Sequence, residues 1–336
     1  MEYAPLLRRL IAGEHLSEDD AASMMGAIMD GSFTPVQSAG LLTALAMTGE
    51  HVPAVTGAAR AMRDRSLHVE HGLPMVVDVV GTGGDGANTI NISTMTALTV
   101  AASGTPVAKH GNRAASSVCG TADVLEASGM RIDVEPQRAA DMLRETGFTF
   151  MFAQRYHPAM KNVGPVRREL GVRTIFNVLG PLTNPARATH QVVGVARPEH
   201  IELVGDVLRG LGVRAGAVVH ASSGIDEVSG EGPTTVYTFD EGESRRWTLE
   251  PEAYGIRTPL DDLRGGSVDA CRHAFERILS GEQSPRADVV ALNAGLVFTV
   301  CKRTTNLKEG IELARTLLKE GRAAAVFERA KQFSHG

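Results

Sequence analysis

Glycines, hydroxyls and amides gather directly after a short apolar run of this sequence. The run Met75–Val80 is followed by Gly81-Thr-Gly-Gly-Asp-Gly86 and then by Asn91-Ile-Ser-Thr94. Glycines after a strand let backbone N–H groups face a phosphate, because no Cβ stands in the way. Hydroxyl and amide side chains at a helix N-terminus add donors for an anion. The pattern therefore favours an anion site, and a tight turn with an ordinary serine cap is the plainer alternative.

A second unit of the same kind follows. The run Thr105–Lys109 leads into Lys109-His-Gly-Asn-Arg113 and then into a loop of small and hydroxyl residues that ends at Thr121. Because neighbouring parallel strands end at one edge of a sheet, the two loops are expected to form one site there. We expect Lys109 and Arg113 to be mobile cations in it, with few acidic residues to balance them. A solvated loop with two surface cations is the alternative.

Two further charged groups could take part in such a site. Asp226-Glu227 follows the apolar run Ala217–His220, and adjacent carboxylates after a strand suit Mg²⁺, although such a pair alone is more often a solvated turn. The pair Arg167-Arg168 lies on a predicted helix, where a guanidinium could hold a carboxylate in bidentate geometry. A salt-bridged surface helix, with Glu169 as a neighbour, is the structural alternative.

The elements that must position these residues divide the chain in two. Residues 1–65 show helical periodicity and no strand signal, and Thr34-Pro-Val-Gln37 is a capping-box start. After residue 72, strands alternate with helices, which indicates a mostly parallel sheet with helices on both faces. Strands are expected at 75–80, 105–109, 148–152, 190–195, 215–220 and 234–239, and helices at 93–102, 122–128, 138–146, 159–171 and 199–210.

The predicted fold class is α/β, with a small all-helical N-terminal domain and a larger domain built on a central, mostly parallel sheet flanked by helices. The helical domain is expected over residues 1–70, joined by the helical segment 159–178, and the larger domain over 71–336. Residues 240–262 are polar and acidic and are expected at the surface. A last α/β piece is expected over 267–330.

Composition narrows the class of protein. The 336 residues are 43% hydrophobic and 22% charged, which excludes a mainly disordered chain. A net charge of −5 argues against a nucleic-acid partner. Three cysteines at no metal-ligand spacing do not indicate a disulfide framework. The start lacks a signal-peptide core, and the most apolar run, Val289–Val300, is too short to span a bilayer. We therefore expect a soluble cytoplasmic protein with no membrane partner.

Taken together, the motifs resemble one family. The two loops, the run Tyr156–Pro185 and Gly224-Ile-Asp-Glu227 are similar to those of the anthranilate phosphoribosyltransferases of tryptophan biosynthesis, over nearly the whole chain. The resemblance implies a fold like that of nucleoside phosphorylases and phosphoribosyltransferases, and a homodimer formed through the helical domain. It also implies Mg²⁺-dependent transfer of the phosphoribosyl group of 5-phosphoribosyl-1-pyrophosphate to the amine of anthranilate.

The resemblance also implies site residues. The phosphoribosyl donor would be bound by Gly81, Gly84, Asp85, Thr89, Asn91, Ile92, Ser93, Thr94, Lys109, His110, Gly111, Asn112, Arg113, Ala114, Ala115, Ser116, Ser117 and Thr121. Anthranilate would meet Gly81, Asn112 and Arg167, and Mg²⁺ would meet Ser93, Asp226 and Glu227. No residue is assigned as acid, base or nucleophile. Lys109 and Arg113 would instead stabilise the leaving pyrophosphate electrostatically.

Two other functions are weighed against this one. A pyrimidine-nucleoside phosphorylase-like enzyme would share the architecture, but its Lys-x-Ser-x-Gly-Gly loop has no match here. A non-catalytic, nucleic-acid-binding relative would be expected to carry a basic surface stripe and to have lost the site motifs.

Overall fold

The computed structural model describes residues 2–114 and 118–336, and its N-terminal part is helical as predicted. Four helices form this part: α1 (Tyr3–Ile11), α2 (Glu18–Met29), α3 (Pro35–Thr48) and α4 (Val52–Asp64). The capping box before α3 is confirmed: Oγ1 of Thr34 accepts from the Gln37 N–H at 3.2 Å, and Oε1 of Gln37 accepts from the Thr34 N–H at 3.0 Å.

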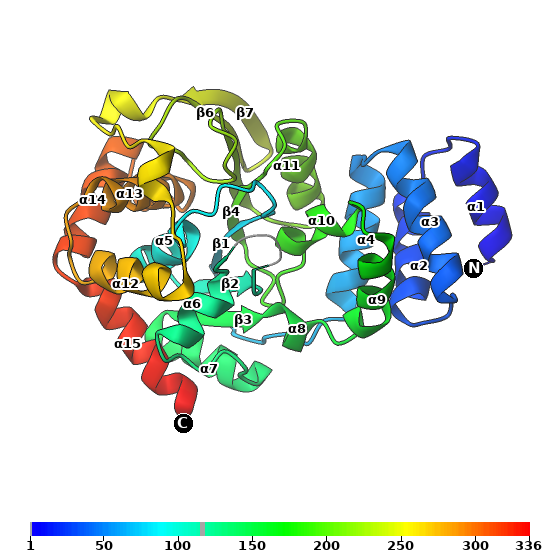
Figure 1. Cartoon of the computed structure of the whole chain (residues 1–336), viewed down its shortest axis with the longest axis horizontal. Helices are drawn as coiled ribbons and strands as arrows, with labels where there is room; N and C mark the ends of the chain where they lie inside the picture. The colour runs from blue at the N-terminus through cyan, green and yellow to red at the C-terminus, as the bar shows by residue number, and fades with distance from the viewer. Residues whose placement is uncertain (1, 115–117) are drawn as a thin grey trace.

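A seven-stranded sheet forms the centre of the larger part, and the six predicted strands are confirmed (Figure 1). The strands are β1 (Val77–Gly81), β2 (Val107–Gly111), β3 (Phe148–Phe152), β4 (His190–Gly194), β5 (Ala215–Ala221), β6 (Thr234–Asp240) and β7 (Glu243–Leu249). Their order is β3-β2-β1-β4-β5-β6-β7, parallel from β3 to β5 and antiparallel from β5 to β7. The prediction of a mostly parallel sheet is confirmed.

Helices cover both faces of the sheet. The helices of this part of the chain are α5 (Ile92–Ala101), α6 (Thr121–Ala127), α7 (Pro136–Thr146), α8 (Ala153–Tyr156), α9 (Met160–Leu170), α10 (Phe176–Leu179), α11 (His200–Gly210), α12 (Val268–Leu279), α13 (Pro285–Val300), α14 (Leu307–Lys319) and α15 (Arg322–His335), of which α9 packs against α2 and α3 instead of the sheet. Short 3₁₀ turns lie at Gly180–Leu182, Pro251–Tyr254 and Leu260–Leu263. No helix in the described part of the chain is both long and apolar enough to cross a membrane.

One prediction about the C-terminal third is confirmed and another is wrong. The segment expected at the surface, 240–262, is mostly exposed, and it also holds the edge strand β7, which was not predicted. The expected last α/β piece, 267–330, is described throughout and holds only helices. An apolar run such as Val289–Val300 fits a buried strand or a buried helix equally well, and here it is the buried helix α13.

Alternate strand residues face two different cores. Val192 packs in the core under α5 and α12–α15, whereas Val193 packs in a core that continues into the helical part through Leu41 and Val55. The buried Arg63 of α4 adds a polar link, because its Nε donates to the Leu182 carbonyl at 2.6 Å. The helical part therefore shares a core with one face of the sheet.

The sheet order fixes where a ligand can approach. From β1 the chain runs to β2 and β3 on one side, and it returns to β4 and β5 on the other side of β1. Such a reversal leaves a crevice beyond the carboxyl ends of the two strands, where ligands of open α/β sheets bind. Here the crevice lies beyond Gly81 of β1 and Gly194 of β4, which are paired in register.

Candidate active site

The acidic pair lies directly over the ends of β1 and β4. A Cβ at Gly194 would overlap the carbonyl oxygen of Asp226, and a Cβ at Gly81 would overlap its carboxylate. Both strands must therefore end in glycine for the 224–229 loop to reach this place. Sequence reasoning singled out Gly81 but missed Gly194. The available signal was a glycine that ends a predicted strand.

Three carboxylates meet at this point. The Gly83 N–H donates to Oδ2 of Asp226 at 2.7 Å, and the Asp226 N–H donates to Oδ2 of Asp85 at 3.4 Å. Burial, together with the Asp85 carboxylate, raises the pKa of Asp226 to about 7. Burial and then the carboxylates of Asp226 and Asp85 raise the pKa of Glu227 well above its usual range, while the Ser93 N–H lowers it. Ser93, Asp226 and Glu227 thus come together at the start of α5.

The residues present fit a magnesium ion. Buried carboxylates that repel one another are stabilised by a hard cation, and their oxygen atoms are the ligands that Mg²⁺ prefers. Within the described ranges, no three His, Cys, Asp or Glu side chains are grouped as a complete metal site. A Mg²⁺ ion takes one or two protein carboxylates and completes its shell with phosphate oxygens and water.

Lys109 is a buried cation, not the mobile one that was predicted. Its side chain lies on β2 and is 1% exposed, and its Nζ donates to the Val79 carbonyl at 2.5 Å and to Oγ of Ser93 at 3.3 Å. Burial lowers the pKa of Lys109 to about 8, against the opposing effect of the carboxylates of Asp78, Glu227 and Asp226. The ammonium group is therefore mostly charged at neutral pH and held in place.

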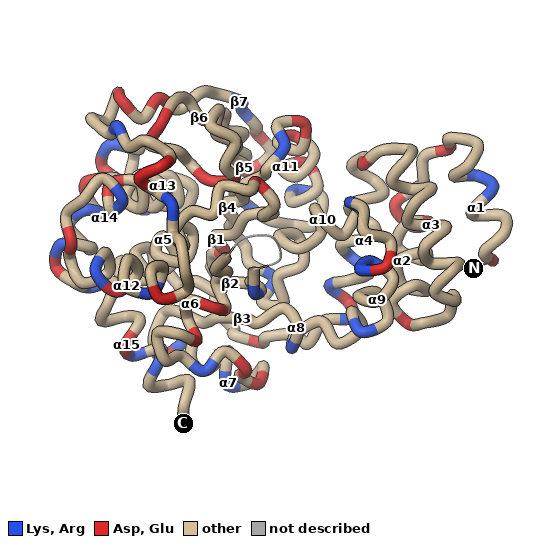
Figure 2. The backbone as a smooth tube through the Cα atoms, in the orientation of Figure 1, with Lys and Arg blue, Asp and Glu red and all other residues tan. Residues whose placement is uncertain are grey.

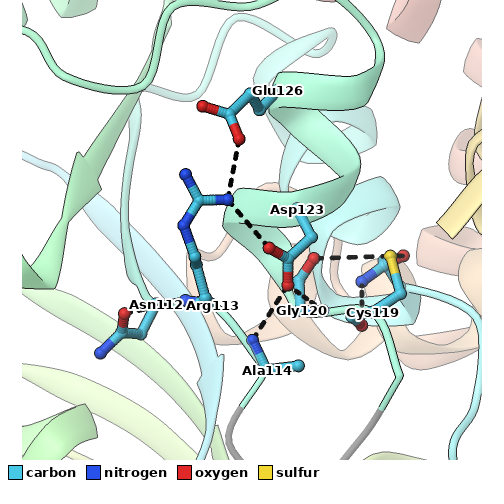
Figure 3. Close-up of polar contacts among 8 residues, drawn as sticks. Asn112, Arg113, Ala114, Cys119, Gly120, Asp123 and Glu126 are labelled. Atoms are coloured by element: carbon cyan, nitrogen blue, oxygen red, sulfur yellow. Dashed lines mark hydrogen bonds and ion pairs between the residues drawn. The ribbon is translucent and has the colours of Figure 1, made fainter.

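Arg113 also differs from the prediction, because acidic residues do balance it (Figure 3). Its Nη1 pairs with Asp123 at 3.0 Å and with Glu126 at 2.8 Å, both on α6. The hydrogen bonds that Arg113 donates to the carboxylates of Glu126 and Asp123 raise its pKa above the usual value. The sequence-based reasoning looked for acidic residues within the loop, whereas they come from the helix that follows it.

Asp123 closes the base of the loop between β2 and α6, and sequence reasoning missed it. One carboxylate oxygen, Oδ2, accepts from the Ala114 N–H at 3.0 Å and from the Gly120 N–H at 2.9 Å (Figure 3). The signal was an acidic residue in the first turn of a predicted helix. The predicted donor contacts Ala115, Ser116 and Ser117 lie outside the described residues.

The two predicted loops lie against each other. The side-chain amide of Asn91 donates to the Cys119 carbonyl at 3.1 Å, and Oγ1 of Thr94 lies 3.2 Å from Oγ1 of Thr121. The start of α5 therefore forms one wall with the end of the second loop. Thr89, which also belongs to the first loop, forms an isolated antiparallel β-bridge with Arg264.

The remaining candidates differ in what their side chains do. Ile92 is fully buried and packs in the core. His110 is also buried, and its Nε2 lies 3.2 Å from Nε2 of His157. Asn112 is exposed, and its side-chain oxygen accepts from the Arg113 N–H at 2.8 Å. Gly111 ends β2 beside the Phe150 ring.

Arg167 stacks on an aromatic ring. It lies on α9 with its guanidinium 5.1 Å from the centre of the Phe176 ring, and burial lowers its pKa. No hydrogen bond joins it to Gly81 or Asn112 in the described part of the chain. The three residues predicted to meet anthranilate are thus not linked directly to one another.

Comparison with known proteins places both parts of the chain. Residues 4–66 match the family described as "Glycosyl transferase family, helical bundle domain", and residues 73–324 match "Glycosyl transferase family, a/b domain". The chain is 49% identical over 335 residues to the anthranilate phosphoribosyltransferase of Thermomicrobium roseum, covering 98% of this chain and 96% of the relative. It is 46% identical over 331 residues to that of Symbiobacterium thermophilum, covering 98% and 97%.

Solved structures agree with the sequence relatives. The anthranilate phosphoribosyltransferase of Thermus thermophilus superimposes with a TM-score of 0.93 at 44% identity, over 98% of this chain and 99% of that one. The Saccharomyces cerevisiae enzyme, solved in complex with PRPP and Mg, superimposes with a TM-score of 0.91 at 27% identity, over 99% of both chains.

Proposed function

Because the chain belongs to the anthranilate phosphoribosyltransferase family, we propose roles for its own residues in that family's reaction. The enzyme transfers the phosphoribosyl group of 5-phosphoribosyl-1-pyrophosphate to the amine of anthranilate and releases pyrophosphate. The observation that carries the site assignment is the meeting of Asp226, Glu227 and Lys109 with the start of α5, beyond the ends of β1 and β4.

The reaction needs positive groups aimed at the pyrophosphate. As this group leaves, C1 of the ribose becomes cation-like and negative charge accumulates on the phosphates, so fixed donors accelerate the step. Lys109 and the N-terminus of α5 supply such donors, and Asp226, Glu227 and Ser93 would hold Mg²⁺. When bound, Mg²⁺ adds charge neutralisation for the leaving group.

The donor pocket is proposed to be the wall formed by the two loops. The pocket is proposed to include the residues named above from Gly81 to Thr94 and from Lys109 to Thr121. The Asp123 carboxylate joins the two ends of the second loop, because it accepts hydrogen bonds from the N–H groups of Ala114 and Gly120. Ile92 and His110 have buried side chains, so only their backbone groups can face the donor.

No strong base is needed for the acceptor. The aromatic amine of anthranilate is neutral at pH 7 and loses its proton readily once it is bonded to C1, so orientation is the main requirement. Arg167 is proposed to hold the anthranilate carboxylate, with Gly81 and Asn112 as the other contacts. Its stacking on Phe176 fixes the direction of the guanidinium before anthranilate arrives.

The helical part is proposed to form the interface of a homodimer. The boundary between the two domains is proposed to lie between residues 70 and 71, with the helical segment 159–178 joining the helical domain. Ile11, Val36 and Met47 are 72%, 81% and 84% exposed, and the helices that carry them, α1 and α3, lie at the end of the molecule away from the sheet (Figure 1). Helix α9 packs beside α2, and Nδ2 of Asn162 donates to the Met29 carbonyl at 2.7 Å. Three free cysteines support a reducing, cytoplasmic location.

The rival functions gain no specific support. Membership of the anthranilate phosphoribosyltransferase family argues against the phosphorylase-like alternative. Basic and acidic residues are interspersed over both parts of the backbone in Figure 2, and no single basic stripe stands out in that view. Salt-dependent retention on heparin would be the observation that favours a nucleic-acid partner.

A fluorescence assay tests the proposed function. Protein, anthranilate, 5-phosphoribosyl-1-pyrophosphate and MgCl₂ are mixed, and anthranilate fluorescence is followed with an EDTA control. A loss of fluorescence that needs all four components is expected. A folded protein that shows no loss would contradict the assignment of anthranilate as acceptor, and other amines and nucleosides would then be screened.

A further inference from the structure

The glycine-rich turn after β1 has the backbone of an anion site. Gly83, Gly84 and Gly86 have φ angles of 65°, 79° and 74°, the left-handed region that few other residues adopt. Successive backbone N–H groups in such turns can point toward one anion. The Gly83 N–H is already taken by Asp226, and all three glycines are exposed.

The side chain that reaches this turn is Arg173. A Cβ built on Gly84 would lie 3.4 Å from Nη1 of Arg173, so the guanidinium lies directly beside the turn. Arg173 belongs to the short segment between α9 and α10, about 90 residues further along the chain. It is exposed and makes no hydrogen bond or ion pair with any described residue.

The other cations near the site are already engaged. Arg113 is paired with Asp123 and Glu126, and Lys109 is buried against the Val79 carbonyl. Meanwhile the turn itself carries the carboxylate of Asp85 and borders that of Asp226. The Mg²⁺ proposed above would offset part of this negative charge, and Arg173 is placed to supply further positive charge at the turn itself.

We propose that Arg173 binds the diphosphate group of the donor, and the product pyrophosphate, over the glycine-rich turn. This inference rests on the function proposed above. A guanidinium offers two parallel N–H donors to phosphate oxygens, and an unpaired one gives up no existing ion pair to do so. Arg173 follows directly after α9, which packs against α2 and α3, so the proposed contact would place the donor beside a segment joined to the helical part.

The test compares Arg173→Ala and Arg173→Lys with Arg168→Ala, which removes an exposed arginine of the preceding helix α9. The Michaelis constant is measured for each substrate, and binding of pyrophosphate with Mg²⁺ is measured by calorimetry. For Arg173→Ala, the KM of the donor and the Kd of pyrophosphate are expected to rise about tenfold, the size of one charge-assisted contact. The KM of anthranilate is expected to change less than about twofold. Arg173→Lys is expected to lie between Ala and wild type, because it keeps the charge but loses the paired donors.

Each outcome bears on the inference. If Arg173→Ala and Arg168→Ala have the same donor KM and the same pyrophosphate Kd, Arg173 does not bind the diphosphate. If Arg173→Ala raises the KM of anthranilate alone, the guanidinium serves the acceptor and the proposal is overturned. A wild-type enzyme without transfer activity would contradict the proposed function. The calorimetric comparison would still decide the role of Arg173. Unchanged melting temperatures show that each variant is folded.

Discussion

Buried charge dominates this molecule at the scale of single residues. Asp78 and Lys109 lie on neighbouring strands, and both side chains are buried. Burial raises the pKa of Asp78 to about 6, despite the opposing effect of Lys109. The amide of Asn184 satisfies the same carboxylate at 2.7 Å. Burying charge is costly unless partners are provided, so this group of residues is rigid. The rigidity keeps the Lys109 ammonium at the crevice before the donor arrives.

The acidic pair gives the first residue-scale prediction. Asp226→Asn combined with Glu227→Gln removes both ionisable carboxyl groups while keeping the size of both side chains. The maximal rate is expected to fall at least about tenfold, and the Mg²⁺ concentration for half-maximal rate to rise, because a neutral amide is a poor ligand for a hard cation. Titration of activity with MgCl₂ measures both. A variant with the wild-type titration curve would show that the pair holds no metal.

Arg167 is predicted to matter for anthranilate and not for the donor. Arg167→Ala is expected to raise the KM of anthranilate about tenfold or more and to leave the KM of the donor within about twofold, because it removes one side of substrate binding. Steady-state kinetics with each substrate varied in turn provides the measurement. Equal increases for both substrates would indicate an arginine that supports the fold through Phe176 instead.

At the scale of elements, glycines set how closely backbones approach. Helices α13 and α14 cross where Gly295 and Gly310 meet, and a Cβ on Gly310 would lie 2.7 Å from the Gly295 carbonyl oxygen. Helices α2 and α4 cross in the same way at Gly57, where a Cβ would overlap the Glu18 carbonyl. Neither helix pair could pack at this distance with alanine at these positions.

The α2–α4 crossing gives a stability prediction. Gly57→Ala is expected to lower the free energy of unfolding by about 1–3 kcal/mol, because the helices must separate to admit the methyl group. Gly210→Ala is the matched control, since its Cβ would lie 3.5 Å from Cγ2 of Thr56, an ordinary contact distance. That change is expected to be neutral or to stabilise by up to about 1 kcal/mol. Urea unfolding of both variants measures the difference, and equal losses would rule out the crowded crossing.

At the scale of the whole molecule, a buried histidine pair couples stability to pH. Burial lowers the pKa of His157 to about 4, and burial together with His157 lowers the pKa of His110 well below its usual 6.5. Below pH 6.5 the unfolded chain takes up protons at these rings and the folded protein does not. The contribution of this pair to the free energy of unfolding is therefore fully present above pH 6.5, and it is lost as the pH falls toward 4.

The expected loss is about 1.4 kcal/mol per pH unit for each ring over that range. Urea unfolding between pH 7.5 and 4.5 measures it. His157→Asn is expected to have a lower free energy of unfolding at pH 7.5. That free energy is also expected to fall less steeply as the pH decreases, because the variant lacks one of the two rings that stay neutral in the folded protein. The exposed ring of His273 is the control, and His273→Gln is expected to keep the wild-type slope. If His157→Asn keeps that slope as well, the pair does not govern acid stability.

The sequence by itself determined the features that depend on neighbouring residues. The capping box at Thr34, the six predicted strands and the glycine-rich turn rest on periodicity and on local hydrogen bonds, and these act within a few residues. The family motifs that identified the reaction are also short segments. Where the local pattern was ambiguous, as in the apolar run of α13, the prediction failed, and the polar, exposed strand β7 was predicted as surface but not as a strand.

Only the tertiary structure decided which groups face one another. The contact between Gly83 and Asp226 spans 143 residues, and no local pattern indicates that Gly194 must leave room for Asp226. The same holds for the charges: Lys109 became buried and Arg113 paired, and Arg173 was left beside Gly84. The reason is physical, because side-chain partners depend on how the chain packs in three dimensions, whereas local propensities are set along the chain.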